Sequence, residues 1–137
     1  MENEVCIPIN SEFDIVTARQ KGKEMAVPLG FSNTELTLIA TAISEVVRNI
    51  VEYARSGELC LNIVREGDKR GIAVIASDRG PGIPNIKLAM QDGYSTGKSL
   101  GLGLPGAKRL MDEFEIVSEV GKGTKITMKK WVQKNVR

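Results

Sequence analysis

The sequence predicts an α+β fold, a two-layer α/β sandwich in which helices pack against a β-sheet. Two segments with helical spacing of apolar residues, 11–27 and 32–54, stand together near the start of the chain. The strand-like segments that follow come in pairs instead of alternating singly with helices, which excludes a run of βαβ units. A length of 137 residues suits one compact domain, so residues 1–137 are predicted to form a single domain.

The first 30 residues predict an edge strand and a helix. Residues 5–9 form a short segment in which Val5, Ile7 and Ile9 stand at alternate positions, as in a strand. The segment includes Pro8, which an edge strand tolerates. Ser11 is the expected cap of a helix that runs to Val27, where a proline and a glycine stop it. The buried side of this helix is expected to hold its apolar residues Phe13, Ile15, Val16, Ala18 and Met25.

The second helix is expected to begin at a cap, Ser32 or Asn33, and to end near Ala54. Its core-facing residues share helical spacing: Leu36, Ile39, Ala40, Ile43, Val47 and Ile50. Two strands follow at 58–64 and 71–77, and the second is a continuous apolar run typical of a central strand.

The last third predicts a short helix, a loop, another helix and a hairpin. The short helix covers 85–91, the loop 93–100 and the longer helix 104–114. Strands at 115–120 and 124–132 are joined by a Gly-Lys-Gly turn, which indicates an antiparallel hairpin.

Composition excludes several function classes. The chain has no histidine, which excludes His-based acid–base catalysis, His metal sites, Ser-His-Asp triads and histidine autophosphorylation. The net charge is +2 without a dense basic cluster, so no nucleic-acid partner is expected. No signal-peptide pattern or long apolar run is present, so a cytoplasmic protein without a membrane partner is expected. Cys6 and Cys60 lie in apolar runs without CxxC spacing and are expected to be buried, reduced thiols.

The stretch "GYSTGKSLGLGLPG" contains the letters Gly97-Lys98-Ser99, which also end a P-loop. A P-loop needs a glycine separated from this triplet by four residues, and Asp92 occupies that position, while Gly93 is one residue too close. It also needs a preceding strand, whereas a helix is expected before this loop. A P-loop is therefore rejected, and so is a dinucleotide-binding fold, because the glycines from 101 to 106 lack a preceding strand too.

Three other motifs carry candidate chemistry. Asp78 ends an apolar strand just before Gly80 and Gly82. A carboxylate at this position can accept a hydrogen bond from the exocyclic amine of a ligand. The alternative is an ordinary turn, which Asp, Gly and Pro residues often form. Gly101, Gly103 and Gly106 surround a helix start, which favours anion binding. Glu45 and Asn49 are four residues apart and share a helix face. The amide oxygen of Asn49 can ligate Mg²⁺, and the carboxylate of Glu45 can act as a base toward a hydroxyl. The commoner alternative for such a polar stripe is a solvated helix surface.

Together, the order and spacing of these motifs resemble the GHKL ATP-binding superfamily, which includes gyrase and the histidine kinases. The segments "TAISEVVRNIVEYA", "DRGPGI" and "DGYSTGKSLGLGLPGAKRLMDEFEI" are most similar to the serine/threonine switch kinases of the bacterial stressosome, and less so to the anti-sigma-factor kinases. The resemblance covers nearly the whole chain. It implies the Bergerat ATP-binding fold, with a mixed sheet backed by helices on one face and ATP, with Mg²⁺, between the helices and a lid.

The resemblance also implies a role for each motif residue. Asp78 would hold the adenine amino group, helped by Gly80 and Gly82 and, through water, by Thr124. Asn49 would ligate Mg²⁺. The glycines of the second box, Gly101, Gly103 and Gly106, would let the phosphates approach the backbone, and Glu45 would accept the proton of the attacking hydroxyl.

The lid departs from the related kinases. The anti-sigma-factor kinases carry a lid arginine, whereas this chain has no arginine between Gly82 and Arg109. Lys98 is the nearest cation. It is either a catalytic point charge at the γ-phosphate or a solvated lid residue.

The implied activity is transfer of the ATP γ-phosphate to a serine or threonine of a STAS-domain antagonist protein. The kinase would then be freed to activate a downstream regulator such as a phosphatase, in a stress-response partner switch. The alternatives are an ATPase module, which normally has appended domains, and an ATP-gated binding module that sequesters a regulator such as a sigma factor. The oligomeric state stays open between a monomer and a weak dimer.

Overall fold

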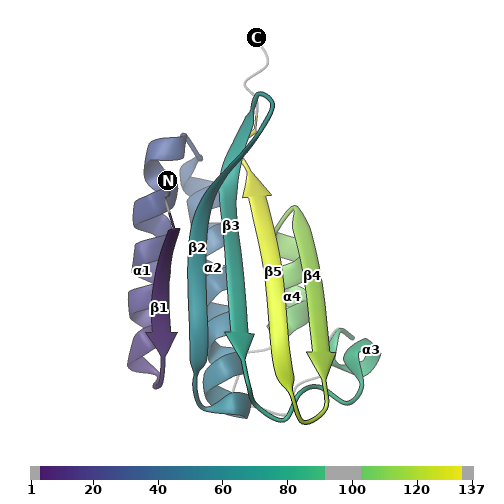
Figure 1. Ribbon diagram of the computed structural model, residues 1–137. Helices are drawn as coiled ribbons and strands as arrows, with labels where there is room; N and C mark the ends of the chain where they lie inside the picture. The colour runs from purple at the N-terminus through teal and green to yellow at the C-terminus, as the bar shows by residue number, and fades with distance from the viewer. Residues whose placement is uncertain (1–3, 92–102, 134–137) are drawn as a thin grey trace.

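The computed structural model describes residues 4–91 and 103–133, which form two layers (Figure 1). One layer is a five-stranded sheet, and helices α1, α2 and α4 lie behind one face of it. The strands are β1 (Glu4–Ile9), β2 (Gly57–Glu66), β3 (Lys69–Asp78), β4 (Glu113–Glu119) and β5 (Gly123–Trp131). The helices are α1 (Phe13–Ala26), α2 (Asn33–Asn49), α3 (Ile86–Ala89) and α4 (Gly103–Leu110). The predicted α+β sandwich with helices on one face is confirmed.

The sheet has the order β1-β2-β3-β5-β4, and all four neighbouring pairs of described strands are antiparallel. The prediction of a mixed sheet was therefore wrong. Two helices connect β1 to β2, so the chain returns to the end at which β1 finished, and β2 runs the opposite way. The hairpin of β4 and β5 then places β5, not β4, beside β3 (Figure 1).

Helix α1 buries a stripe of small and aliphatic residues: Ile15, Ala18, Gly22 and Ala26. Phe13 is 85% exposed and Val16 is 44% exposed, so their predicted burial was wrong. Both residues lie off the 3.6-residue period of the buried stripe. The predicted cap at Ser11 was also wrong, because the Asp14 carboxylate instead accepts hydrogen bonds from the backbone N–H groups of Asn10 and Ser11 at 2.7 and 3.1 Å.

Helix α2 is the centre of the core, and its predicted N-terminus is confirmed. Ser32 Oγ accepts from the Glu35 backbone N–H at 3.1 Å, and the Glu35 carboxylate accepts from the Ser32 N–H at 2.9 Å. This reciprocal pair satisfies two backbone donors at the helix start. The last turn, Ile50–Ala54, is a π-helix, so the helical chain ends at Ala54 as expected. Between α2 and the sheet lie fully buried side chains, among them Ile39, Ile43, Val46, Leu59, Val74 and Met128.

Helix α4 ends at Leu110, four residues earlier than predicted, and Phe114 belongs to β4. Lys130 Nζ donates to the Leu110 carbonyl oxygen at 2.9 Å, which satisfies a carbonyl of the final helical turn. Asp112 then joins the sheet, because its N–H donates to the Lys129 carbonyl at 2.9 Å and its carboxylate accepts from the Trp131 N–H at 2.8 Å. The predicted hairpin that follows is confirmed.

Cys6 and Cys60 form a disulfide, so the prediction of buried, reduced thiols was wrong. The two residues are direct partners in the β1·β2 ladder. The alternation of each strand turns them away from the helices, and Cys6 is exposed while Cys60 is half-buried. Their apolar sequence neighbours, such as Ile7 and Leu59, point to the opposite face and pack in the core.

Among the described helices, none is long and apolar enough to cross a membrane.

Candidate functional site: a cavity between α2 and the end of β3

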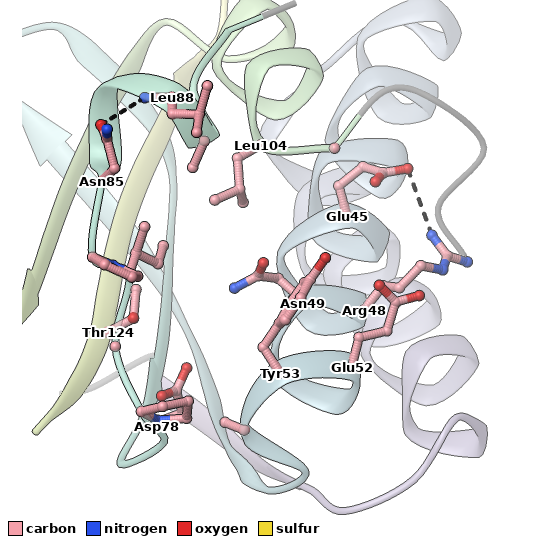
Figure 2. Close-up of a pocket in the computed structure, with 17 residues that line it drawn as sticks. Glu45, Arg48, Asn49, Glu52, Tyr53, Asp78, Asn85, Leu88, Leu104 and Thr124 are labelled. Atoms are coloured by element: carbon pink, nitrogen blue, oxygen red, sulfur yellow. Dashed lines mark hydrogen bonds and ion pairs between the residues drawn. The ribbon is translucent and has the colours of Figure 1, made fainter. Parts of the chain in front are cut away.

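A cavity of about 330 Å³ lies between α2 with its π-helical end on one side and the segment that follows β3 on the other (Figure 2). This volume is at the lower end of the range typical of small-molecule sites. Its lining includes Glu45, Arg48, Asn49, Glu52, Tyr53, Asp78, Gly82, Leu88, Gly103, Leu104 and Thr124. Predicted site residues that are far apart in the sequence therefore meet around one space.

The helical wall is a polar stripe on one face. Glu45, Asn49, Glu52 and Tyr53 follow the spacing i, i+4, i+7 and i+8, and all four line the cavity. Glu45 is only 7% exposed, so this end of the stripe is not an ordinary solvated surface. Asn49 lies between Glu45 and Tyr53 and faces the cavity (Figure 2). The continuation through the π-helix places Glu52 and Tyr53 at the cavity as well.

Asp78 forms part of the facing wall. It is the last residue of β3 and is paired with Gly57 of β2 and Thr124 of β5. Its Oδ1 accepts a hydrogen bond from the Gly80 backbone N–H at 2.8 Å. That bond fixes the orientation of the carboxylate. The other oxygen, Oδ2, can accept a hydrogen bond from a ligand.

Gly80 and Gly82 are required first by the protein's own packing. A Cβ atom on Gly80 would lie 2.6 Å from Cβ of Ala54, at the end of the π-helix. Gly82 has a φ of 80°, and a Cβ there would clash with the Glu119 carbonyl oxygen. Gly82 lines the cavity, whereas the predicted site residue Gly80 does not line it and packs against Ala54, which does. Both glycines thus bring the segment after β3 close to its neighbours.

Replacing Gly82 with alanine is expected to destabilise the fold more than the same change at Gly121. Gly121 has a similar φ of 83°, but a Cβ there meets no atom within 4 Å. Gly121→Ala should cost about 1–2 kcal/mol for the left-handed backbone. Gly82→Ala should cost a further 1–3 kcal/mol, roughly, for the clash. The free energies of unfolding in urea measure this difference, and equal losses would contradict the packing role of Gly82.

Thr124 is buried and hydrogen-bonded beneath the cavity. Its hydroxyl lies 2.8 Å from the Ser118 hydroxyl on the neighbouring strand β4. Ser118 Oγ also accepts from the Ile83 backbone N–H at 2.7 Å, which ties the segment after β3 to the hairpin. The sequence prediction included Thr124 but missed Ser118. Only the strand register, with Ser118 opposite Thr124, identifies it.

The second glycine box is described only in part. Gly103 begins α4 and lines the cavity, while Gly106 is buried inside that helix and does not line it. Lys98, Gly101 and the predicted lid at 93–100 lie outside the described residues.

The sequence prediction gave no role to Arg48 or Tyr53, and both line the cavity. Nη1 of Arg48 lies 3.5 Å from Oε2 of Glu45, so a guanidinium stands beside the buried carboxylate (Figure 2). The spacing of three residues on one helix was a signal for this pair. Tyr53 lies beside Asn49 on the helical wall of the cavity, where an aromatic ring is suited to contact a flat ligand (Figure 2).

The oxygen donors on α2 suit Mg²⁺. Asn49 offers an amide oxygen, and Glu45 and Glu52 offer carboxylates on the same wall of the cavity. Mg²⁺ usually takes only one or two protein oxygens and completes its octahedron with water and substrate phosphates. The donor set at Asn49 therefore fits such an ion.

Comparison with known proteins identifies the family. The model of the histidine kinase-like ATPase domain matches residues 8–130. The chain belongs to this family. The predicted membership of the GHKL superfamily is thereby confirmed.

Individual relatives agree with the predicted branch. The chain is 48% identical to the serine/threonine-protein kinase RsbT of Bacillus subtilis, over 97% of this chain and 100% of that protein. It is 37% identical to an anti-sigma F factor of Clostridium kluyveri, over 70% of each chain. A crystal structure of RsbU and RsbW domains from a Mycobacterium tuberculosis protein has the same fold, with a TM-score of 0.61 at 24% identity, over 93% of this chain and 31% of that one.

Proposed function

We propose that this chain is a serine/threonine protein kinase that transfers the γ-phosphate of ATP to a hydroxyl of a partner protein. It is homologous over nearly its full length to a protein serine/threonine kinase, which supports the predicted enzyme class. The observation that carries the proposal is the shared cavity of Glu45, Asn49 and Asp78. A buried carboxylate, a metal-binding amide and a nucleotide-facing aspartate are the groups that this reaction needs.

The nucleotide is proposed to lie across the cavity from Asp78 to Glu45. Oδ2 of Asp78 would accept from the exocyclic amine of adenine, with Gly82 and Thr124 beside the ring and Tyr53 against its face. The phosphates would extend toward α2 and the N-terminus of α4, where Gly103 lies. Asn49 would hold Mg²⁺, which neutralises phosphate charge when bound.

Glu45 is proposed to be the general base. Its carboxylate would accept the proton of the attacking serine or threonine hydroxyl as that oxygen bonds to the γ-phosphorus. The bond from the γ-phosphorus to the bridging oxygen breaks at the same time, and ADP leaves. Burial of Glu45 keeps water from competing for the same carboxylate.

Arg48 is proposed to be a positioning residue that orients Glu45. Arg48→Met removes the charge but keeps most of the stem, and turnover should fall roughly 10- to 100-fold because a charged hydrogen-bonding partner contributes about 1.5–3 kcal/mol. The Michaelis constant for ATP should change less than turnover does, and Arg48→Lys should restore part of the rate. Arg65→Met, an exposed arginine near the far end of β2, is the control and should leave turnover unchanged. A normal rate in Arg48→Met would exclude this role.

The partner is proposed to be a STAS-domain antagonist protein, with a regulator such as a phosphatase as the downstream target, in a cytoplasmic stress-response switch of the stressosome type. The relatives support partner switching, since one is a kinase and another an anti-sigma factor. Similarity to the anti-sigma factor also keeps ATP-gated sequestration of a regulator as a second candidate.

The experiment that separates these functions is incubation of the protein with γ-labelled ATP, Mg²⁺ and a candidate STAS-domain protein. Label on a serine or threonine of the partner is the expected result. Release of free phosphate alone would indicate an ATPase. Nucleotide-dependent capture of the partner without either product would indicate a binding module, and both outcomes would overturn the kinase proposal for that partner.

A further inference from the structure

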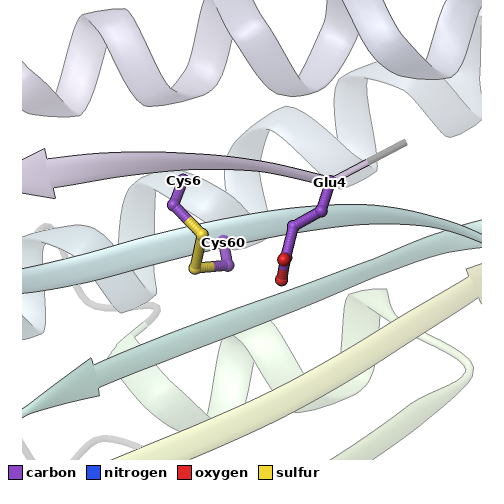
Figure 3. Close-up of side chains that lie close together, drawn as sticks. All are labelled: Glu4, Cys6 and Cys60. Carbon is purple, nitrogen blue, oxygen red and sulfur yellow. A yellow bond between two sulfur atoms is a disulfide. The ribbon is translucent and has the colours of Figure 1, made fainter. Parts of the chain in front are cut away.

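The face of the sheet opposite the helices carries a second group of reactive side chains, far from the nucleotide cavity. Cys6 on β1 and Cys60 on β2 are joined by a disulfide, and Glu4 lies two residues before Cys6 on the same face (Figure 3). One oxygen of Glu4 and the two sulfur atoms all lie within 4.8 Å of one another. Three potential metal ligands therefore converge on one point of the open face.

We propose that Cys6, Cys60 and Glu4 form a binding site for a thiophilic divalent cation such as Zn²⁺, available when the disulfide is reduced. Zn²⁺ takes thiolate and carboxylate ligands, and two thiolates at about 2.3 Å on a tetrahedral ion lie roughly 3.8 Å apart. The ligand atoms of Glu4, Cys6 and Cys60 already lie within 4.8 Å of one another, so the sulfur–sulfur distance that the ion requires does not exceed the present size of the cluster. The fourth position would face solvent and hold water, because Glu4 and Cys6 are exposed.

The backbone supports such a site without rearrangement. Cys6 is directly opposite Cys60, and Glu4 is directly opposite Asn62. The Asn62 amide donates to Glu4 Oε2 at 3.4 Å, which holds the carboxylate over the strand pair. After reduction, each cysteine side chain is free to rotate, since neither packs in the core. The strand ladder thus fixes the spacing, and the side chains supply the small movement that an ion requires.

The neighbouring strand β3 places no positive charge beside the pair that would oppose a cation. The residues of β3 that face the same side near Cys60 are Ala73, Ile75 and Ser77, and all three are uncharged. Lys125 and Lys129 follow on β5, which is two strands from β2 and therefore about 9–10 Å away. No described lysine on this face is positioned in the strand register to occupy the space between the sulfurs and Glu4.

The two states exclude each other. A dithiol reductant transfers two electrons and two protons to the disulfide, which leaves two thiols while the reductant becomes a disulfide. Binding of Zn²⁺ then replaces both thiol protons, which are released to solvent. The edge strand β1 is therefore tied to β2 by a covalent bond in one state and by an ion in the other.

The test uses the full chain, free of nucleotide, with Mg²⁺ in excess and Co²⁺ as a spectroscopic probe. The reduced protein should bind one Co²⁺ with a thiolate-to-metal charge-transfer band, and Zn²⁺ should displace it. The oxidised protein, which has the same sequence, should show no band. The proposal is overturned if the reduced chain gives no band, or if the oxidised chain gives the same one.

Variants locate the ion. Cys60→Ser should abolish the band, and Glu4→Gln should weaken Co²⁺ binding by about tenfold or more. Glu58→Gln is the matched control, because Glu58 is an exposed carboxylate two residues from Cys60 on the same face of β2. Unchanged affinity in Glu4→Gln would remove Glu4 from the site, and an unchanged band in Cys60→Ser would refute the site altogether. Circular dichroism checks that each variant is folded.

Discussion

Replacing Glu45 with glutamine is expected to reduce turnover by roughly 10² to 10⁴ while ATP affinity stays near the wild-type value. Glutamine has almost the same shape as glutamate, so the packing around this 7%-exposed side chain is kept. It cannot accept the hydroxyl proton at neutral pH. Because the proposed proton transfer occurs only in the reaction, the loss should appear in the rate and not in nucleotide binding.

Two measurements on Glu45→Gln check the assignment. The rate of label transfer from γ-labelled ATP to the partner gives turnover, and calorimetry gives nucleotide affinity. Glu52→Gln is a suitable comparison, because Glu52 lines the same cavity about two turns further along the helix. A Glu45→Gln variant with normal transfer, or a Glu52→Gln variant with the larger loss, would move the base away from Glu45.

Replacing Asp78 with asparagine is expected to weaken ATP binding by about 1–3 kcal/mol, roughly a five- to 150-fold rise in the dissociation constant. The asparagine oxygen can still accept from the Gly80 N–H, a bond of 2.8 Å in the native chain, so the turn is kept. Its other terminal atom becomes an NH₂ donor. A donor would then face the amine of adenine, and the two repel.

The same substitution should change base preference, which separates a specific role from general damage. A 6-oxopurine triphosphate such as inosine triphosphate presents an acceptor where adenine presents its amine. It should lose less affinity than ATP in Asp78→Asn, or gain affinity. Calorimetry with both nucleotides measures this, and an equal loss for the two would show that Asp78 does not contact the base edge. The urea unfolding curve of the variant serves as the stability control.

The start and the orientation of helix α2 are the parts of the fold that local sequence patterns predict most directly. Ser32 and Glu35 have the spacing of a capping box, and the apolar face of α2 has a clear 3.6-residue period, so both the start and the orientation of this helix were predictable. Phe13 and Val16 were misplaced because α1 buries small residues such as Ala18 and Gly22, which give a weak apolar signal. The antiparallel pairing of β3 with β5 depends on where β4 is placed, which no local pattern specifies.

The candidate site divides in the same way. Glu45 and Asn49 share a helix face by spacing alone, and Asp78 stands at a strand end, so their convergence at one cavity was accessible from the sequence with the family resemblance. Ser118 was not, since its role comes from strand register and from the Ile83 N–H, 35 residues away. The pairing of Cys6 with Cys60 also depends on strand register, which brings these two residues from separate apolar runs together on the face of the sheet opposite the helices.

The pairing of Asp78 with Gly57 on one side and Thr124 on the other has a consequence for local unfolding. Asp78 is the last residue of β3, but a strand lies on each side of it, so its backbone separates only when both pairings open. Amide hydrogens along this row should therefore exchange with solvent more slowly than those at the ends of the edge strands β1 and β4. The end of the cavity proposed to read the base would then be organised before any nucleotide arrives, and binding would cost little ordering of the backbone there.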